Sequence, residues 1–251
     1  MLHGIVSCAE SFRPMADALP PRRHVLAIEM PLLDERLRGD ATLAGHARDV
    51  RRVLCALGIR RYVLAGHSHG GLVAMEMVTS AGAEEIAGVV LLCPANPYSL
   101  AEKPVVAFYR SRAGRLFAHL LPYLPERILI RGTEAMSGPK NTVSHARRRI
   151  YVRAIRRRFL IGPILRILDT WWQDMDSLRQ RLEAAPIRTP TLLLWGACDR
   201  VVPISSAAAL RSHLRESELL ELAGVGHLPN EEAPEACAEA IERWWSGHHF
   251  G

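Results

Sequence analysis

Residues 62–78 read YVLAGHSHGGLVAMEMV, and this stretch decides the fold. It begins with an apolar run of strand length, passes through the pattern Gly-x-Ser-x-Gly from Gly66 to Gly70, and continues as an apolar segment of helical length. Between a strand and a buried helix, this pattern is typical of a sharp turn that holds a serine hydroxyl out at the end of the strand. The glycines lack the Cβ atoms that would clash in so tight a turn. Ser68 is therefore the candidate nucleophile.

Other apolar runs of strand length recur on both sides of this turn, each bounded by Gly, Pro or charged residues. With the run at Tyr62 to Gly66, the predicted strands are His24 to Glu29, Gly88 to Cys93, Thr191 to Trp195 and Glu218 to Leu222. Amphipathic helices are predicted at 43–57 and from Pro234 to Gly247. Alternating strands and helices indicate an α/β fold, with a mostly parallel sheet and helices on both faces.

The alternation breaks between Ser99 and Ile187. This segment has several helical patterns and no convincing strand, and it is too long for an ordinary loop. We therefore expect a helical cap at 99–187, inserted into a core made of 1–98 and 188–251.

Basic charge is concentrated in the insertion. From Ser99 to Thr189 there are 18 Lys+Arg and 7 Asp+Glu, a net charge of +11, whereas the rest of the chain carries 14 and 19, or −5. The arginine clusters at 147–149 and 156–158 are expected on a solvated face of one helix, and attraction of an anionic substrate, an acyl carrier or a membrane surface is the alternative. Charge alone, without a motif, does not indicate nucleic-acid binding.

A serine hydroxyl is a weak nucleophile that needs a base, and the base needs an acid to orient it. Asp199 follows the strand predicted at 191–195, and His227 follows the strand predicted at 218–222. Parallel strands bring both loops to the edge of the sheet that carries Ser68. Asp199 is thus the candidate orienting acid and His227 the candidate general base. The backbone N–H of His69, at the start of the next helix, is the candidate donor to a substrate oxyanion.

Four other histidines near the motifs are assigned noncatalytic roles. His67 and His69 flank the serine on a tight turn, so their side chains point away from its hydroxyl and are expected to line the site or to form local hydrogen bonds. His46, on an amphipathic helix, is expected either to have its hydrogen-bond partner or to be partly exposed. His3 is expected to form structural hydrogen bonds.

The chain resembles the α/β-hydrolase superfamily, specifically serine esterase-like members with a helical cap. Four pieces carry the resemblance: Leu2-His3-Gly4, the Ser68 turn, the W-G-x-x-D-x-x-V-P stretch at 195–203, and G-x-G-H-x-x-x-x-E-x-P-E at 224–235. The resemblance implies a second oxyanion donor at the backbone of Ile5. It also implies hydrolysis of a small-molecule carboxylic ester without a metal or an organic cofactor. Relatives that act as dehalogenases or epoxide hydrolases use an aspartate nucleophile, which Ser68 argues against.

Several activities remain open for such a site: thioester hydrolysis, acyl transfer, C–C bond cleavage, or ligand binding without catalysis. Trp171 and Trp172 are the candidate substrate-binding residues, favouring an apolar or aromatic acyl group. The alternative is that they belong to the core of the cap. The five cysteines are expected to be reduced thiols, and the oligomeric state stays open.

Only Met1 and Leu2 precede His3, whereas in the family two further strands precede this motif. We therefore expect a sheet without its first strands, little anchoring for the Ile5 loop, and Met1 to be an internal residue of a longer reading frame. Met1 to Glu10 lacks the pattern of a secretory signal, and no apolar run is long enough to span a bilayer. These features predict a cytoplasmic location without stable membrane insertion.

Overall fold

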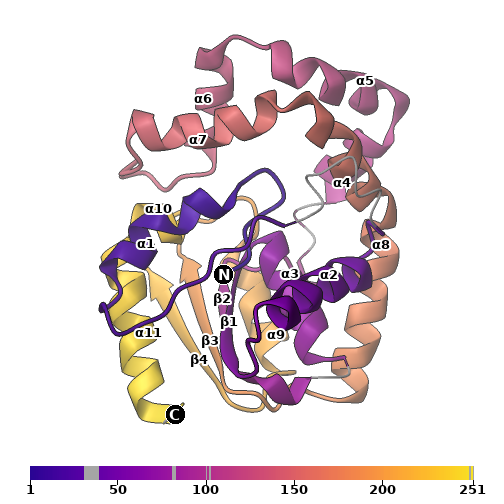
Figure 1. The fold of residues 1–251 in the computed structure, drawn as a ribbon. Coiled ribbons are helices and arrows are strands. Elements are labelled where there is room, and N and C mark those ends of the chain that lie inside the picture. Colours follow the sequence, from indigo (N-terminus) through magenta and orange to yellow (C-terminus); the bar gives the residue numbers. More distant parts are fainter. Residues whose placement is uncertain (31–39, 81–82, 100, 102, 249, 251) are drawn as a thin grey trace.

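A computed structural model describes residues 1–30, 40–80, 83–99, 101, 103–248 and 250. Its sheet has four parallel strands in the order β1-β2-β3-β4 (Figure 1). The strands are β1 Tyr62–His67, β2 Ile86–Leu92, β3 Thr191–Gly196 and β4 Ser217–Leu222. The predicted parallel α/β sheet is confirmed, and each of these four strands begins and ends within two residues of its predicted bounds.

Beyond β1, the first residues of the chain extend the sheet by single bridges. Leu2 pairs in parallel with Gly66 on one side and with Ile28 on the other. Its N–H donates to Ala65 O at 2.8 Å, and its carbonyl accepts from His67 N–H at 3.0 Å. The strand predicted at His24 to Glu29 is therefore wrong, because only Ile28 forms a bridge there. The Ile5 loop, expected to be poorly anchored, follows a residue that is bonded to β1 and fully buried.

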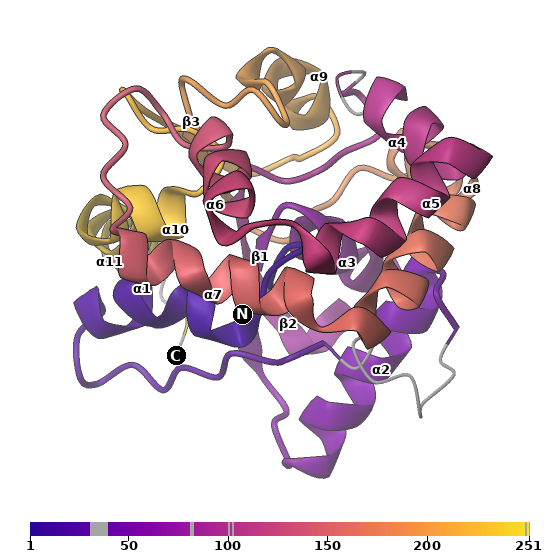
Figure 2. The same ribbon diagram turned by 90° about the horizontal axis from the view of Figure 1, so that it is seen from above.

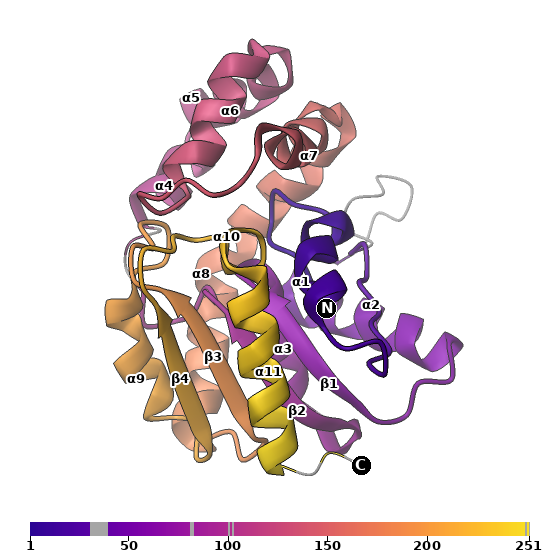
Figure 3. The same cartoon turned by 90° about the vertical axis from the view of Figure 1, so that its left-hand side faces the viewer.

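Helices cover both faces of the sheet (Figure 3). Alternate residues of β2 point to opposite sides: Val89 and Leu91 belong to one apolar core, and Val90 and Leu92 to the other. The first core is closed by α2 Leu43–Ala56, α3 His69–Val78, α9 Ala207–Arg211 and part of α8 Ile161–Ala184. The second is closed by η1 Ala9–Phe12, α1 Arg13–Ala18 and α11 Pro234–His248. The remaining short helices of the core are η4 Ala83–Glu85, η7 Ile204–Ser206 and α10 Pro229–Glu232.

The described residues between β2 and Ile187 form helices and no strand, as predicted. They are α4 Lys103–Arg110, α5 Arg112–Leu120, η5 Leu121–Tyr123, α6 Glu126–Ala135, α7 His145–Arg156, η6 Arg158–Leu160 and α8. Helices α4 to α7 lie over the carboxyl ends of the strands (Figures 1 and 2). Helix α8 runs from these helices into the first core, where its Leu178 and Leu182 are fully buried. Among the described residues, no helix is both long and apolar enough to cross a bilayer.

The two arginine clusters differ from the expected solvated face. Arg147, Arg148 and Arg149 lie in α7. This helix ends at Arg156, so the other two arginines of the second cluster, Arg157 and Arg158, lie beyond its end. Arg148 is only 2% exposed. Its guanidinium donates to Ser137 Oγ at 3.0 Å and to the side chains of Thr133 and Asn141. The solvated face is therefore wrong for Arg148, whose side chain ties α7 to α6 and the turn that follows.

Candidate active site

Ser68 sits on a strained turn between β1 and α3. Its φ of 52° and ψ of −118° lie outside the regions that non-glycine residues favour. The turn is so tight that a Cβ on Gly66 would lie 2.3 Å from the carbonyl oxygen of Gly70. Helix α3 begins at His69, and the first N–H groups of a helix have no partner within it. The serine therefore stands where the positive end of α3 meets the carboxyl edge of the sheet.

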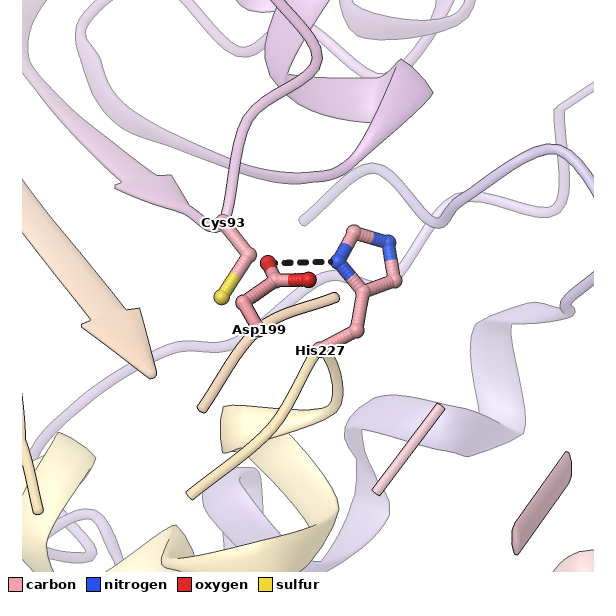
Figure 4. A group of neighbouring side chains, drawn as sticks. All are labelled: Cys93, Asp199 and His227. Carbon is pink, nitrogen blue, oxygen red and sulfur yellow. Dashed lines mark hydrogen bonds and ion pairs between the residues drawn. The ribbon is translucent and has the colours of Figure 1, made fainter. Parts of the chain in front are cut away.

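Asp199 and His227 meet at this same edge (Figure 4). His227 Nδ1 lies 2.8 Å from Asp199 Oδ2, and both side chains are buried. The other carboxylate oxygen, Oδ1, accepts the backbone N–H groups of Val201 and Val202 at 2.8 and 2.9 Å. An ionised aspartate in this position holds the imidazole with its proton on Nδ1, which leaves Nε2 free to accept a proton.

Glu232 holds the loop that carries His227. Its buried carboxylate accepts three backbone N–H groups, those of Gly138, Gly226 and Leu228, at 2.8, 3.1 and 3.1 Å. The N–H of His227 itself donates to Met136 O at 2.7 Å. We call residues 223–228, which carry His227, the base loop. Glu232 and the turn after α6 therefore both hold the base loop by hydrogen bonds. Glu232 is the first of the two glutamates that define the motif at 224–235, and this motif was the available signal, but the role of Glu232 was missed.

His67 links the serine turn to the base loop. Its Nε2–H donates to the backbone carbonyl of His227 at 2.7 Å, and the two rings are 5.0 Å apart. Burial lowers the pKa of His67 to about 3, so the ring is neutral at neutral pH. The sequence placed His67 near the site, but this bond joins residues 160 positions apart and was not foreseen.

On the other side of the serine, His46 and His69 form a buried pair. His46 Nδ1 and His69 Nε2 are 3.0 Å apart. Burial lowers the pKa of His46 to about 4, and burial together with the nearby His46 takes the pKa of His69 well below its usual range. Both rings are therefore neutral at neutral pH, and His46 has a hydrogen-bond partner, which is one of the two outcomes expected from the sequence.

The Ile5 loop lies against the serine turn. A Cβ on Gly4 would be 3.3 Å from Ser68 Cβ and 3.2 Å from His67 Nδ1, so only a glycine fits this approach without displacement. His3 forms the structural bonds expected of it, with Gly4 O at 2.8 Å and with the N–H of Met30 at 3.2 Å.

Trp171 and Trp172 line a cavity of about 330 Å³ between the loop after β2 and α8. The other lining residues are Asn96, Pro97, Ser99, Lys103, Met175, Asp176 and Arg179. Trp171 also belongs to the first core and stacks on His69, with ring centroids 6.1 Å apart. Trp171 therefore packs in the first core, between His69 and the cavity that it lines.

Cys93 lies beside the Asp199–His227 pair, with its sulfur and their ligand atoms all within 4.8 Å of one another (Figure 4). Burial raises the pKa of the Cys93 thiol well above its ordinary value, so the sulfur keeps its proton. Its Sγ lies 3.7 Å from Gly226 O and 3.4 Å from the N–H of Gly196. These contacts hold the side chain beside Asp199.

A parallel sheet, a serine on a strained turn before a buried helix, and an Asp–His pair at the same edge are the features of an α/β hydrolase. The chain belongs to the alpha/beta hydrolase family, whose model matches residues 1–240.

Two relatives and one solved structure illustrate the similarity. The chain is 25% identical over 243 residues to the uncharacterized hydrolase YugF of Bacillus subtilis (strain 168), covering 96% of this chain and 86% of that protein. It is 22% identical over 263 residues to monoacylglycerol lipase ABHD6 of Mus musculus, covering 99% of this chain and 75% of that protein. The crystal structure of Cfl2 from Burkholderia cenocepacia matches with a TM-score of 0.82 and 18% identity, over 97% of this chain and 86% of that one. Family membership and the lipase among the relatives support a hydrolase activity.

Proposed function

We propose that this protein is a serine hydrolase that cleaves carboxylic esters of apolar or aromatic acyl groups through an acyl-enzyme. The observation that carries the proposal is the 2.8 Å bond between His227 Nδ1 and Asp199 Oδ2, at the sheet edge where Ser68 stands on its strained turn. The His67 bond, which holds the base loop against this turn, supports a catalytic triad made of the serine, the histidine and the aspartate.

In the proposed reaction, Ser68 Oγ attacks the ester carbonyl carbon while His227 Nε2 takes the hydroxyl proton. Asp199 stabilises the imidazolium, and the N–H groups of His69 and Ile5 bind the oxyanion. Collapse of the tetrahedral intermediate breaks the bond to the alcohol, which leaves with the proton from His227. Water, deprotonated by His227, then attacks the acyl-enzyme and releases the carboxylic acid and the free serine. No step requires a metal or an organic cofactor.

We assign the acyl group to the cavity lined by Trp171 and Trp172. Two indole rings supply a large apolar surface, and the stacking of Trp171 on His69 connects this cavity to the serine turn. The name of the relative from Mus musculus, a monoacylglycerol lipase, agrees with an ester substrate that has an apolar acyl chain.

The test is labelling with a fluorophosphonate probe, together with hydrolysis of p-nitrophenyl butyrate. The parent should be labelled and should release p-nitrophenol, and Ser68→Ala should lose both properties. Ser246→Ala, at an exposed serine of α11, is the matched control and should behave as the parent. An unlabelled parent, or labelling that survives Ser68→Ala, would refute the proposal.

A further inference from the structure

The helices above the sheet expose an unusual number of large apolar side chains. Of the eleven that are exposed among the described residues, eight lie between Val105 and Phe159. We call five of them the apolar patch: Phe108, Leu116, Phe117, Leu120 and Tyr123. The two most exposed, Leu116 and Tyr123, leave 65% and 61% of their surface in solvent. Such a concentration on one part of a surface marks an interaction site.

The patch residues form one continuous face. The rings of Phe108 on α4 and Phe117 on α5 contact each other, with centroids 5.9 Å apart. On α5, Leu116 and Phe117 each lie about one turn before Leu120, and Tyr123 follows in η5. Of these helices, α5 lies far from the sheet, whereas α4 lies nearer to it (Figure 1).

Helix α5 is apolar on its inner side as well. Its Ala118 is buried in a small cluster with Ile161 and Leu165 of α8. A helix that is apolar on two sides is ordinarily covered on both, because each side loses free energy in water. The outer side of α5 therefore requires an apolar environment that the described residues do not supply.

Cations accompany the patch. Residues 103–135 hold six Lys+Arg and two Asp+Glu. Five exposed arginines on or beside these helices form no ion pair with any acid in the described parts of the chain: Arg110, Arg112, Arg127, Arg131 and Arg158. The Arg158 guanidinium lies over the Tyr123 ring, 4.6 Å from its centroid, so apolar and cationic groups are interleaved at this surface.

We propose that the apolar patch and these arginines dock the protein on the surface of an anionic lipid bilayer. Apolar side chains that enter the headgroup boundary, flanked by arginines that meet lipid phosphates, are the two components of such peripheral binding. A second copy of the chain fits this face less well, because a two-fold interface would set the arginines of one copy against those of the other. Peripheral docking also requires no membrane-spanning helix.

Docking by this face has a consequence for orientation. The patch lies on α4, α5 and η5, and helices α4 to α7 lie over the carboxyl ends of the strands (Figures 1 and 2). Ser68 follows β1 at this edge of the sheet, and the loop of His227 follows β4 there. The docked protein therefore presents its candidate active site toward the lipid. The docking is independent of the chemistry of that site, so it goes beyond the proposed ester hydrolysis and is tested separately.

The test is co-sedimentation of the full chain with vesicles. We expect binding to phosphatidylcholine vesicles that contain about one third phosphatidylglycerol, little binding to phosphatidylcholine alone, and weakening as salt rises from about 0.1 to about 0.5 M. The double variant Leu116→Ser/Phe117→Ser should bind about tenfold or more weakly, because it removes two apolar anchors. Arg110→Glu/Arg112→Glu should weaken binding by a similar factor of about ten.

Two matched controls lie outside the patch: Leu57→Ser, at the exposed end of α2, and Arg60→Glu, in the loop that follows. Both should bind as the parent does. All four variants should keep the parental melting temperature, and their hydrolysis of p-nitrophenyl butyrate without vesicles should be unchanged, which separates a failure of docking from a failure of the proposed activity.

Three results would overturn the proposal. The first is absence of binding to the anionic vesicles, and the second is equal loss of binding in the control and patch variants. The third is a dimer in sedimentation velocity that dissociates in Leu116→Ser/Phe117→Ser, because the face would then be an interface between copies.

Discussion

Replacing Glu232 with alanine should destabilise the fold and impair the site together. The change leaves the N–H groups of Gly138, Gly226 and Leu228 without their acceptor in a buried place. Each buried unsatisfied group costs about 1–3 kcal/mol, so the loss in the free energy of unfolding should be about 3–6 kcal/mol once some water enters. For a chain of this length, that corresponds to a fall in melting temperature of about 6–24 °C. Because the same bonds position His227, kcat/KM should fall about a hundredfold.

The measurements are thermal unfolding and hydrolysis of p-nitrophenyl butyrate well below the lowered melting temperature. Glu232→Gln keeps one carbonyl oxygen as an acceptor, so its losses should lie between those of Glu232→Ala and the parent. Glu235→Ala, three residues along and exposed, is the matched control and should change neither quantity. If Glu232→Ala kept the parental melting temperature and kcat/KM, the three hydrogen bonds to the Glu232 carboxylate would contribute nothing to stability or activity.

Three further predictions concern the buried histidines and their aspartate. Asp199→Asn should lower kcat by about four orders of magnitude with little change in KM, because the amide favours the wrong histidine tautomer. A variant with a kcat within a few-fold of the parent would mean that another acid orients His227. His67→Phe should lower kcat about tenfold, because it removes the hydrogen bond to His227 O. His67→Gln keeps an N–H donor and should retain most of the parental kcat. Equal activities of the two variants would contradict this role of His67. The pKa of His46 is about 4 in the folded protein, below its ordinary value of 6.5. As the pH falls, the unfolded chain therefore binds a proton at this histidine before the folded protein does. The stability that is present above pH 6.5 is then lost as the pH falls through about 4. The free energy of unfolding should fall by up to about 1.4 kcal/mol per pH unit. Urea unfolding at several pH values should show a weaker pH dependence of this free energy for His46→Gln than for the parent. An unchanged pH dependence would exclude this histidine as a source.

The local features of this chain were predictable, and the contacts between distant loops were not. The strand, turn and helix around Ser68 follow from one continuous stretch, and the four strands were found within two residues because their apolar runs are sharply bounded. The expected strand at His24 to Glu29 was wrong because its composition is strand-like while a backbone partner exists only at Ile28.

The missed contributions to the site depend on which segments meet in space. A motif identified the position of Glu232, but no spacing rule shows that its carboxylate collects N–H groups from both its own loop and the insertion. The bond from His67 to His227 O likewise depends on how closely two strand ends approach. Arg148 was misplaced because an arginine-rich segment favours exposure, whereas its neutral partners are brought together only by the fold.

The path of α8 has a practical meaning for exchanging parts between relatives. This helix of 24 residues is a rod of about 36 Å that starts among the helices above the sheet and ends inside the first core. A chimera that took residues 99–187 from a relative would import foreign side chains at Leu178 and Leu182, where the host packs tightly. A graft that ended near Leu160, before α8 begins, would exchange the outer helices and keep the host residues Leu178 and Leu182 in the first core. The junction most tolerant of recombination therefore lies well before the place where the helical segment ends in sequence.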